Sequence, residues 1–387
     1  MNAGIVNSPS RTAVTIRGNA MPSEAAPMPF DSNGAIDWRV STSQTWPRFA
    51  RAMRETAYRA SVRDATTTPS GAFSGTNAFV GGVLLPDGRV FCVPYSSTTA
   101  RIYNPVDDTL VTPAGTYPGG TAFYGGVLLR DGRVFCVPYG SATARIYNPV
   151  DNTLFTPAGT YPGTQAFAGG VLLPDGRVFC VPYNSTTARI YNPFANTLTT
   201  PSGAYPGGSA FNGGVLLPDG RVFCVPYSST TARIYNPVDD TLVTPAGTYP
   251  GSVAHNNGVL LLDGRVFCVP RTATAARIYD PIRDTLTVSS ATFQGANSFL
   301  AGVLLPDGRV FLVPFGSTTA RIYDPRNDRL FVAAGSYPGG QAYIGGVLMQ
   351  DGRVFCVPYS TTTARIYGGG GDSYPADVLL SPYLNKF

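Results

Sequence analysis

The chain is poor in the residues on which most catalytic and nucleic-acid-binding sites depend. Only 13% of its 387 residues are charged, with one histidine, His255, one lysine, Lys386, and two glutamates, Glu24 and Glu55. A single histidine and no glutamate after residue 55 leave Ser-His-Asp, Cys-His and histidine-metal sites without the residues they need, so no cofactor is expected. The 28 basic and 23 acidic residues are dispersed. This excludes the clustered basic footprint of a nucleic-acid-binding protein.

Long apolar segments are also missing. The first residues, MNAGIVNSPSRTAVTIRG, lack the apolar core of a signal peptide, and no run of 18 consecutive apolar residues occurs. We therefore expect neither a secretion signal nor a membrane span.

What the chain has in abundance is one repeated unit. An Asp-Gly-Arg triplet recurs every 44 residues without insertion or deletion, beginning at Asp87, Asp131, Asp175, Asp219, Asp263, Asp307 and Asp351. A fixed period of this length is typical of repeat architectures. The 44 glycines and 34 prolines recur in the same register as turn residues, which indicates a turn-rich all-β protein.

Each unit predicts four antiparallel strands. In the first copy these are 79–85, 90–95, 100–103 and 109–112, with a tight Asp87-Gly88 turn between the first two. The second strand reads Val-Phe-Cys-Val without polar alternation, as expected where neighbouring sheets cover both of its faces. Seven such sheets predict a seven-bladed β-propeller.

The two ends of the chain predict how the ring closes. The seventh copy breaks off in a glycine run after its third strand, at 364–367, and never supplies a fourth. Residues 64–73 match 108–117 at an offset of 44, so they contain the missing strand. We expect this N-terminal strand to complete the last blade and leave no open edge between the first and last blades.

The chain divides into four segments. Residues 1–44 form an extended N-terminal arm, 45–61 a short amphipathic helix, 62–367 the propeller and 368–387 a C-terminal tail. The apolar side of the helix carries Trp46, Phe49, Met53 and Ala57. Two roles for the helix stay open: it packs on its own propeller, or it anchors the protein in a partner.

The cysteines occupy a single repeat position. They are Cys92, Cys136, Cys180, Cys224, Cys268 and Cys356, with Leu312 in the sixth copy. Equivalent positions of neighbouring blades lie farther apart than the roughly 7 Å that a disulfide allows between Cα atoms. We predict six buried free thiols that act as small hydrophobic groups.

The sequence LLPDGRVFCVP…ARIYNPVDDTL resembles the kelch repeat, in the form found in galactose-oxidase-like propellers. The shared features are the Asp-Gly turn, the Tyr103-Asn104-Pro105 end of the third strand and the Thr-Leu start of the fourth. The chain departs from kelch units at Pro94-Tyr95, where they have a glycine pair, and at Leu110, where they have tryptophan. The resemblance implies a propeller whose first strand is innermost. Its copper site would need several histidines, and His255 only replaces an aromatic residue of the other copies.

The copies differ most at two positions near the start of the first strand. Since the resemblance places this strand innermost, we expect both positions to ring one mouth of the central channel, and we call them the candidate contact ring. Neutral drift at unrestricted positions would give the same pattern. The residues are Val80, Tyr124, Ala168, Asn212, Asn256, Leu300 and Ile344 at one position, and Asn77, Thr121, Gln165, Ser209, Val253, Asn297 and Gln341 at the other.

Other repeated residues favour structural roles. An ion pair such as Asp87 with Arg101 explains the arginines of each copy, and the Asp107-Asp108 pair predicts a turn rather than a calcium site. The tyrosines at the positions of Tyr95 and Tyr117 cover blade edges or offer exposed platforms for sugar rings.

Two hypotheses for function follow. The first is a non-enzymatic structural and interaction protein, a rigid propeller anchored through residues 1–60 among the other protein subunits of an assembly such as a virion or phage surface. The alternative is a glycan-binding, lectin-like propeller for host or surface attachment. An oxidase-like enzyme follows only from the family resemblance and would require bound copper.

Overall fold

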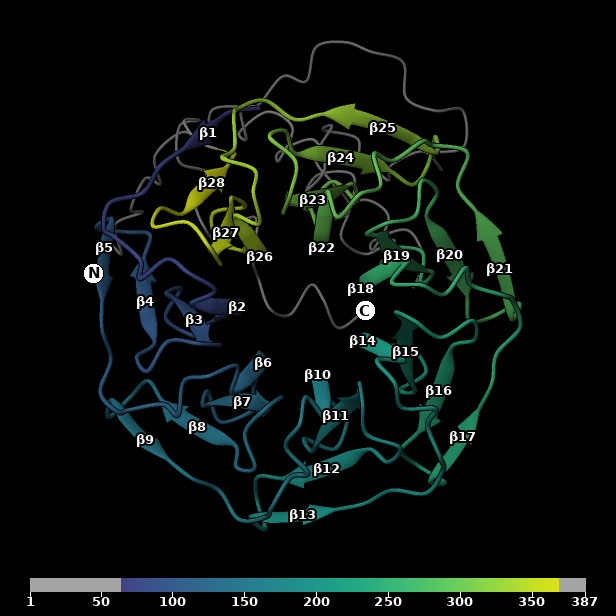
Figure 1. Cartoon of the computed structure of the whole chain (residues 1–387), viewed down its shortest axis with the longest axis horizontal. Helices are drawn as coiled ribbons and strands as arrows, with labels where there is room; N and C mark the ends of the chain where they lie inside the picture. The colour runs from purple at the N-terminus through teal and green to yellow at the C-terminus, as the bar shows by residue number, and fades with distance from the viewer. Residues whose placement is uncertain (1–63, 369–387) are drawn as a thin grey trace, which may run out of the picture. The chain divides into compact units, whose positions relative to one another are not determined.

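A computed structural model describes residues 64–368, which form seven four-stranded antiparallel sheets around a central channel (Figure 1). The seven-bladed propeller is confirmed. The predicted arm, the helix at 45–61 and the tail after residue 368 lie outside the described residues. Within 64–368 no helix is long and apolar enough to cross a membrane.

In each blade the first strand lies at the channel and the second packs outside it. The innermost strands are β2 (Phe79–Leu84), β6 (Phe123–Leu128), β10 (Phe167–Leu172), β14 (Phe211–Leu216), β18 (His255–Leu260), β22 (Phe299–Leu304) and β26 (Tyr343–Leu348). The second strands are β3 (Val90–Pro94), β7 (Val134–Pro138), β11 (Val178–Pro182), β15 (Val222–Pro226), β19 (Val266–Pro270), β23 (Val310–Pro314) and β27 (Val354–Pro358).

The third and fourth strands lead outward to the rim. The third strands are β4 (Arg101–Asn104), β8 (Arg145–Asn148), β12 (Arg189–Asn192), β16 (Arg233–Asn236), β20 (Arg277–Asp280), β24 (Arg321–Asp324) and β28 (Arg365–Tyr367). The outermost strands are β5 (Thr109–Val111), β9 (Thr153–Phe155), β13 (Thr197–Thr199), β17 (Thr241–Val243), β21 (Thr285–Val288), β25 (Arg329–Val332) and β1 (Thr66–Thr67). In the first blade each strand end lies within one residue of its prediction.

The last blade is assembled from both ends of the repeat region. Its sheet order is β1-β28-β27-β26, with Thr66 opposite Tyr367 and Thr67 opposite Ile366. The backbone N–H of Gly368 also donates to the carbonyl of Ala65 at 2.8 Å. The predicted closure is confirmed, and Figure 1 shows β1 beside β28 at the rim.

A β-bulge near the start of the innermost strand brings neighbouring blades close together at the channel. In the first blade the pairing of β2 with β3 shifts between Phe79 and Gly82, and Gly81 has a φ of 76°. A Cβ added to Gly81 would lie 3.3 Å from the Cα of Gly125 in the next blade. Glycine is favoured here because it tolerates both the left-handed backbone and the close approach.

The second strands form the centre of each blade. Phe91, Cys92 and Val93 of β3 are fully buried, as the uninterrupted apolar sequence predicted. All six cysteines are buried and free, which confirms their predicted state. Burial raises the pKa of the Cys92 thiol far above its usual range, so this group is an inert part of the core.

Adjacent blades are joined by a repeated link of three side chains. The ring of Phe91 stacks on Tyr147 of the next blade, with centroids 5.1 Å apart. The Tyr147 hydroxyl donates to Oδ1 of Asn152 at 3.0 Å. The same oxygen accepts the backbone N–H of Ala114, on the chain leaving the first blade, at 3.0 Å. The stacked pairs of all seven interfaces are Phe91–Tyr147, Phe135–Tyr191, Phe179–Tyr235, Phe223–Tyr279, Phe267–Tyr323, Phe311–Tyr367 and Phe355–Tyr103.

The Asn152 position works as a latch in every blade. Its side-chain oxygens accept a backbone N–H of the preceding blade, and the residues are Asp64, Asp108, Asn152, Asn196, Asp240, Asp284 and Asp328. Asn152 has a φ of 55°, in the left-handed region that aspartate and asparagine tolerate better than most residues. The predicted turn is present, and it also fastens one blade to the next.

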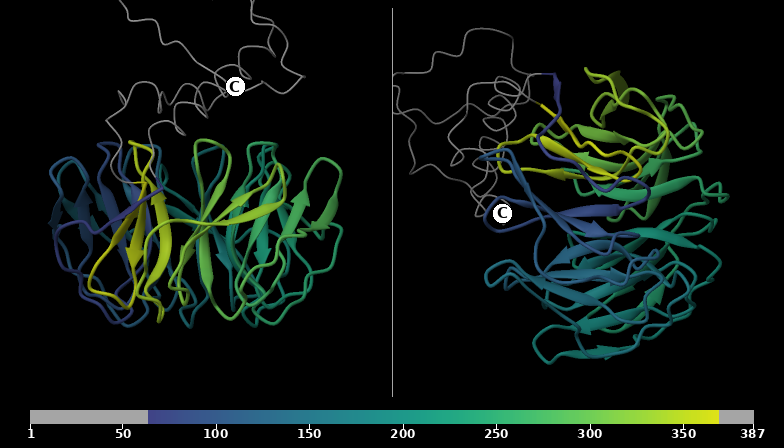
Figure 2. Two further views of the ribbon diagram at one scale, coloured as in Figure 1. Left: turned by 90° about the horizontal axis from the view of Figure 1, so that it is seen from above. Right: turned by 60° about the vertical axis from the view of Figure 1, so that its left-hand side comes forward.

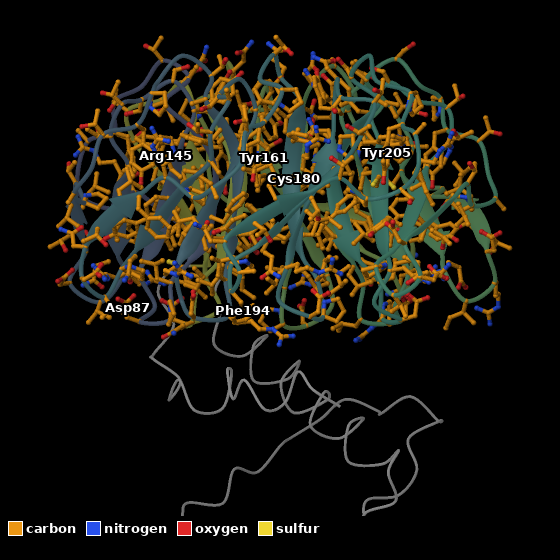
Figure 3. The ribbon with its side chains drawn as sticks, turned by 90° about the horizontal axis from the view of Figure 1, so that it is seen from below. Asp87, Arg145, Tyr161, Cys180, Phe194 and Tyr205 are labelled. Atoms are coloured by element: carbon orange, nitrogen blue, oxygen red, sulfur yellow. The ribbon has the colours of Figure 1, made fainter. Side chains whose placement is uncertain are left out.

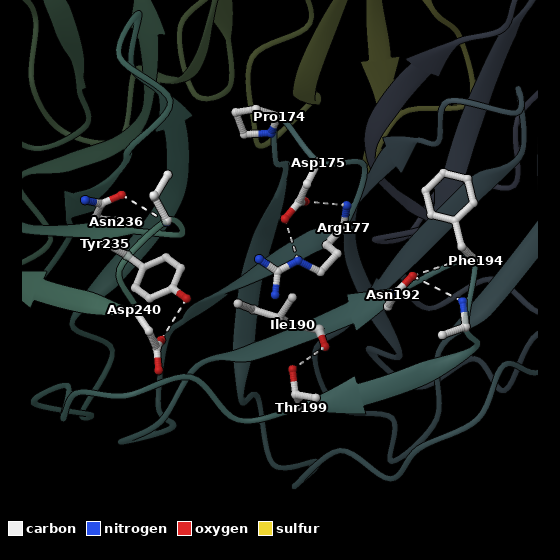
Figure 4. Close-up of polar contacts among 12 residues, drawn as sticks. Pro174, Asp175, Arg177, Ile190, Asn192, Phe194, Thr199, Tyr235, Asn236 and Asp240 are labelled. Atoms are coloured by element: carbon white, nitrogen blue, oxygen red, sulfur yellow. Dashed lines mark hydrogen bonds and ion pairs between the residues drawn. The ribbon is translucent and has the colours of Figure 1, made fainter.

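The predicted ion pair between Asp87 and Arg101 is wrong. Asp87 pairs with Arg89 of the same hairpin at 2.6 Å. Arg101 lies opposite Cys92 in the middle of the sheet, and Figure 3 shows its equivalent Arg145 away from the face that carries Asp87. Figure 4 shows the same hairpin pair in the third blade, Asp175 with Arg177 at 2.7 Å. Such half-exposed pairs contribute about 0–1 kcal/mol each.

Removing the latch side chain should destabilise the propeller more than removing one of the hydrogen bonds that this side chain accepts. Tyr191→Phe deletes one hydrogen bond to Asn196 and should lower the free energy of unfolding by about 1 kcal/mol. Asn196→Ala also leaves the Ala158 N–H without its partner and places alanine at a φ of 50°, so it should cost about 2 kcal/mol or more. Urea-unfolding curves measure both. Asn196→Asp is the control and should be near neutral; an equal loss for Asp and Ala would contradict the latch.

The latch of the sixth blade should make the protein sensitive to acid. Burial opposes ionisation of Asp328, but hydrogen bonds from Ser289, Ser290 and Tyr323 outweigh it and hold its pKa at about 2. Because this pKa lies below that of the unfolded chain, about 3.9, the stabilisation is complete above about pH 4 and is lost as the pH falls towards 2. Melting temperatures measured from pH 6 to pH 2 should fall less steeply for Asp328→Asn than for the wild type. Parallel curves would show that Asp328 does not contribute.

Candidate functional site

A ring of side chains closes around one end of the channel. It is formed by the residue that follows each second strand, and we call it the aromatic belt: Tyr95, Tyr139, Tyr183, Tyr227, Arg271, Phe315 and Tyr359. Neighbouring rings of the belt touch, with centroids 5.6 Å apart for Tyr139–Tyr183 and Tyr183–Tyr227, and 5.9 Å apart for Tyr95–Tyr139 and Tyr95–Tyr359. The belt lies at the opposite end of the blades from the Asp-Gly hairpins, since each second strand runs from its hairpin towards the belt. The edge-on view of Figure 2 shows connecting loops gathered on these two faces.

Backbone hydrogen bonds fix the belt in place. The N–H of Tyr95 donates to the carbonyl of Ala78 in its own blade at 2.8 Å. The carbonyl of Tyr95 accepts the N–H of Ala122 in the next blade, also at 2.8 Å. Each belt residue is therefore held by two blades, and its side chain is aimed by the scaffold rather than by a free loop.

Arg271 is the one belt residue that is not aromatic. Its Nε donates to Oδ1 of Asn297 at 2.7 Å, and its Nη1 donates to the hydroxyl of Tyr227. The guanidinium carbon lies 5.0 Å from the centroid of the Tyr227 ring, a cation–π arrangement. These contacts fix the orientation of the guanidinium group.

The belt surrounds a cavity of about 470 Å³. This volume lies within the range of roughly 300–1,000 Å³ that is usual for small-molecule sites. Arg271 is the only charged side chain among the described residues that line it. The cavity is a concave space lined by aromatic, amide and aliphatic side chains, with a single positive charge.

Polar groups of two inner strands form part of the cavity wall. Tyr124, on β6, packs against Tyr139 with centroids 5.3 Å apart, and its hydroxyl accepts a hydrogen bond from Nδ2 of Asn212 at 3.3 Å. Asn212 is buried, and its Oδ1 has no hydrogen-bond partner in the described part of the chain. On the other side, Leu300 and Ile344 form an apolar cluster with Phe315.

Tyr124, Tyr139 and Tyr227 keep their protons at neutral pH. Burial raises the pKa of Tyr227 to about 12, although the positive charge of Arg271 offsets part of the rise. Burial likewise raises the pKa of Tyr124 and of Tyr139. Their hydroxyl groups can therefore both donate and accept hydrogen bonds.

The candidate contact ring lies at this end of the channel, but only part of it reaches the cavity. At the first position Tyr124, Asn212, Leu300 and Ile344 line the cavity, whereas at the second position Asn297 and Gln341 do. Six of the seven residues at the first position are buried. The role of the ring as a contact surface stays a prediction.

The second position of the candidate contact ring is conformationally restricted. Its residues all have positive φ, from 56° at Val253 to 67° at Gln341. This region is unfavourable for a β-branched residue such as Val253. The variation among the copies is therefore not explained by a lack of backbone restraint.

Two roles were open for the Tyr95 position, cover for blade edges and platforms for sugar rings; in the structure these side chains line the cavity. Of the two roles open for the Tyr117 position, the structure excludes the exposed platform: Tyr117 is 1% exposed and packs edge-on against Phe123 between blades. The sequence did contain one indication of the site. Arg271 is the only break in an otherwise aromatic column of the repeat.

His255 lies at the buried aromatic position predicted for it. It is fully buried, and its ring meets Tyr249 edge-on at 5.9 Å. In the same range no group of three or more His, Cys, Asp or Glu residues could hold a metal ion.

The face opposite the belt carries single exposed apolar side chains. They stand at the tips of the turns between third and fourth strands, and Figure 3 shows one of them, Phe194, on the same face as Asp87. Val106 is 90% exposed and Phe194 71%. The equivalent residues Val150, Val238 and Ile282 are exposed in the same way.

Comparison with solved structures supports the fold. A streptogramin B lyase matches with a TM-score of 0.66 and 10% sequence identity, over 79% of this chain and 98% of that one. Virginiamycin B lyase from Staphylococcus aureus matches with a TM-score of 0.63 and 10% identity, over 78% and 98%. The extracellular domain of a hybrid two component system from B. thetaiotaomicron matches with a TM-score of 0.61 and 12% identity, over 77% of this chain and 39% of that one.

Identities this low show a common fold and nothing about activity. The similar structures include both an enzyme and extracellular domains of regulatory systems. No protein-family model and no curated protein sequence matches the chain. The propeller predicted from the kelch resemblance is confirmed, whereas membership of that family is not shown.

The buried histidine should weaken the fold in mild acid. Burial lowers the pKa of His255 to about 4, and the nearby Arg277 adds to the effect. Because this pKa lies below the unfolded value of about 6.5, the stability present above pH 6.5 is lost as the pH falls towards 4. His255→Phe introduces the residue that most blades have at this position. The melting temperature of this variant should fall less between pH 7 and pH 4 than that of the wild type. Tyr343→Phe, at the same position of the seventh blade, is the control and should leave the pH dependence unchanged; equal slopes for all three proteins would contradict the assignment.

Proposed function

We propose that the protein is a non-enzymatic carbohydrate-binding propeller and that the cavity inside the aromatic belt is its binding site. The observation that carries the proposal is the combination of tyrosine rings, amide groups and one arginine around a space of about 470 Å³. A sugar ring presents apolar C–H faces and polar hydroxyl edges. Tyrosine rings pack against the former, while hydroxyl, amide and guanidinium groups bind the latter.

The chemistry of the lining favours binding over catalysis. The pKa of Tyr227 and of Tyr124 is raised, so these phenols stay protonated, and an arginine does not lose its proton in proteins. Amide side chains such as Asn297 do not titrate. A general acid or base needs a pKa close to the working pH, and the lining residues named here bind and orient a ligand instead.

Attachment to an assembly is a separate proposal. It assigns residues 1–60, with Trp46, Phe49, Met53 and Ala57 on the helix, to contact with other subunits, as on a virion surface. These residues lie outside the described part of the chain, so the assignment stays a prediction. A kelch relationship likewise stays a hypothesis, supported by the Asp-Gly turns and the Tyr103-Asn104-Pro105 strand end.

A glycan array probed with the full chain in multivalent form tests the proposed function. We expect binding to a limited set of glycans and at least a tenfold loss for Tyr124→Ala, because this change removes an aromatic wall of the cavity. The third blade carries Ala168 at the same position, so the scaffold accommodates alanine there. Phe194→Val, which copies Val238 on the opposite face, is the matched control and should bind normally. No binding to any glycan, or unchanged binding by Tyr124→Ala, would contradict the proposal.

A further inference from the structure

We propose that the cavity selects carbohydrates that carry a carboxylate group and that Arg271 binds this carboxylate. The inference rests on the carbohydrate-binding function proposed above and adds the chemical class of the ligand. It is carried by the contacts of Arg271, by the charges around the cavity and by the exposed amide of Gln341.

The guanidinium group of Arg271 is held in place and still has donors to offer. Its Nε and Nη1 bind Asn297 and Tyr227, and no described contact involves Nη2. A fixed guanidinium loses little side-chain entropy when a ligand binds, and its paired N–H groups match the two oxygens of a carboxylate. The group is preorganised for an anion.

The charge of Arg271 is not neutralised by any acidic residue between 64 and 368. In contrast, the seven arginines of the Asp-Gly-Arg hairpins all pair with the aspartate of their own turn, at 2.6–2.7 Å. Arg271 is only partly exposed, and the other charged side chains of its blade do not line the cavity. A partly desolvated cation without a counter-charge favours binding of an anion.

Gln341 distinguishes a sugar acid from a simple carboxylate. It is an exposed residue that lines the cavity, and its amide can donate and accept hydrogen bonds. A ligand hydroxyl can bind this amide while the carboxylate occupies Arg271. Tyrosine rings of the belt then pack against the sugar ring. A uronic or sialic acid unit carries all three of these features.

The repeat supplies an unusually clean variant for a test. Arg271→Tyr restores the residue found at this position in five of the other blades, so it should complete the belt and preserve the fold. Arg283→Gln removes an arginine of the same blade on the opposite face, where its side chain is 76% exposed, and serves as the matched control.

The experiment measures binding of matched sugar pairs to the full chain by calorimetry and saturation-transfer NMR. The acidic probes are the methyl glycosides of glucuronic and galacturonic acid and N-acetylneuraminic acid; the neutral probes are the methyl glucoside, the methyl galactoside and the methyl ester of N-acetylneuraminic acid. We expect at least one acidic probe to bind at least tenfold more tightly than its neutral partner. Arg271→Tyr should abolish this preference, whereas Arg283→Gln should retain it.

The outcomes separate the two proposals. Equal binding of acidic and neutral probes, or an acid preference that survives in Arg271→Tyr, would overturn the role of Arg271 and leave carbohydrate binding in place. No binding of any probe by the wild type, together with an empty glycan array, would overturn both. If Arg271→Tyr melts well below the wild type, the same binding measurements are made on Arg271→Lys. Lysine keeps the positive charge but cannot bind both carboxylate oxygens as a guanidinium group does, so this variant should retain part of the preference for acidic probes.

Discussion

The propeller depends on one contact made seven times, in which a phenylalanine of one blade stacks on a tyrosine of the next while that tyrosine donates to a latch residue. The stack buries apolar surface at the centre of each interface. One side-chain oxygen of the latch residue accepts two hydrogen bonds, as at Asn152. One comes from the tyrosine hydroxyl of its own blade and the other from a backbone N–H of the preceding blade. Because each interface holds both an apolar and a directional polar contact, the angle between blades is set within the interface itself. A ring of seven then closes without adjustment at any single blade.

A scaffold fixed in this way can change a channel residue in one blade without altering the others. The fifth blade makes most use of this freedom. It places His255 where the other copies have an aromatic ring, Asn256 and Asn257 on the inner strand, and Arg271 in the belt. The conserved geometry of the other six blades turns these departures into a local chemical difference. The asymmetry of the site therefore comes from a few side chains and not from any irregularity of the backbone path.

The fold was predictable because the repeat averages out local ambiguity. Seven copies of the Asp-Gly turn and six of the Val-Phe-Cys-Val strand each indicated the same element, and the offset match of residues 64–73 predicted how the ring closes. Pairing between elements was harder to predict. Asp87 pairs with Arg89 rather than Arg101 because the strand register places Arg101 in the middle of the sheet. The spacing of residues in the sequence does not determine this register. The role of the Tyr95 position stayed open between blade-edge cover and sugar platform, because the direction of a side chain just after a strand depends on how the blades tilt around the channel.

The closure of the last blade has a consequence for how the protein comes to exist. β1 and β28 are separated by almost the whole repeat region, so their pairing forms only after every blade has been synthesised. Until then β28 has not been synthesised, and the inner strands of the first blade lack the last blade as their neighbour. Contacts of such long sequence separation are slow to form, and unpaired strand edges invite association between chains. During biosynthesis the vulnerable species is a nearly finished, open ring, and the two-residue strand Thr66–Thr67 is what ends that vulnerability.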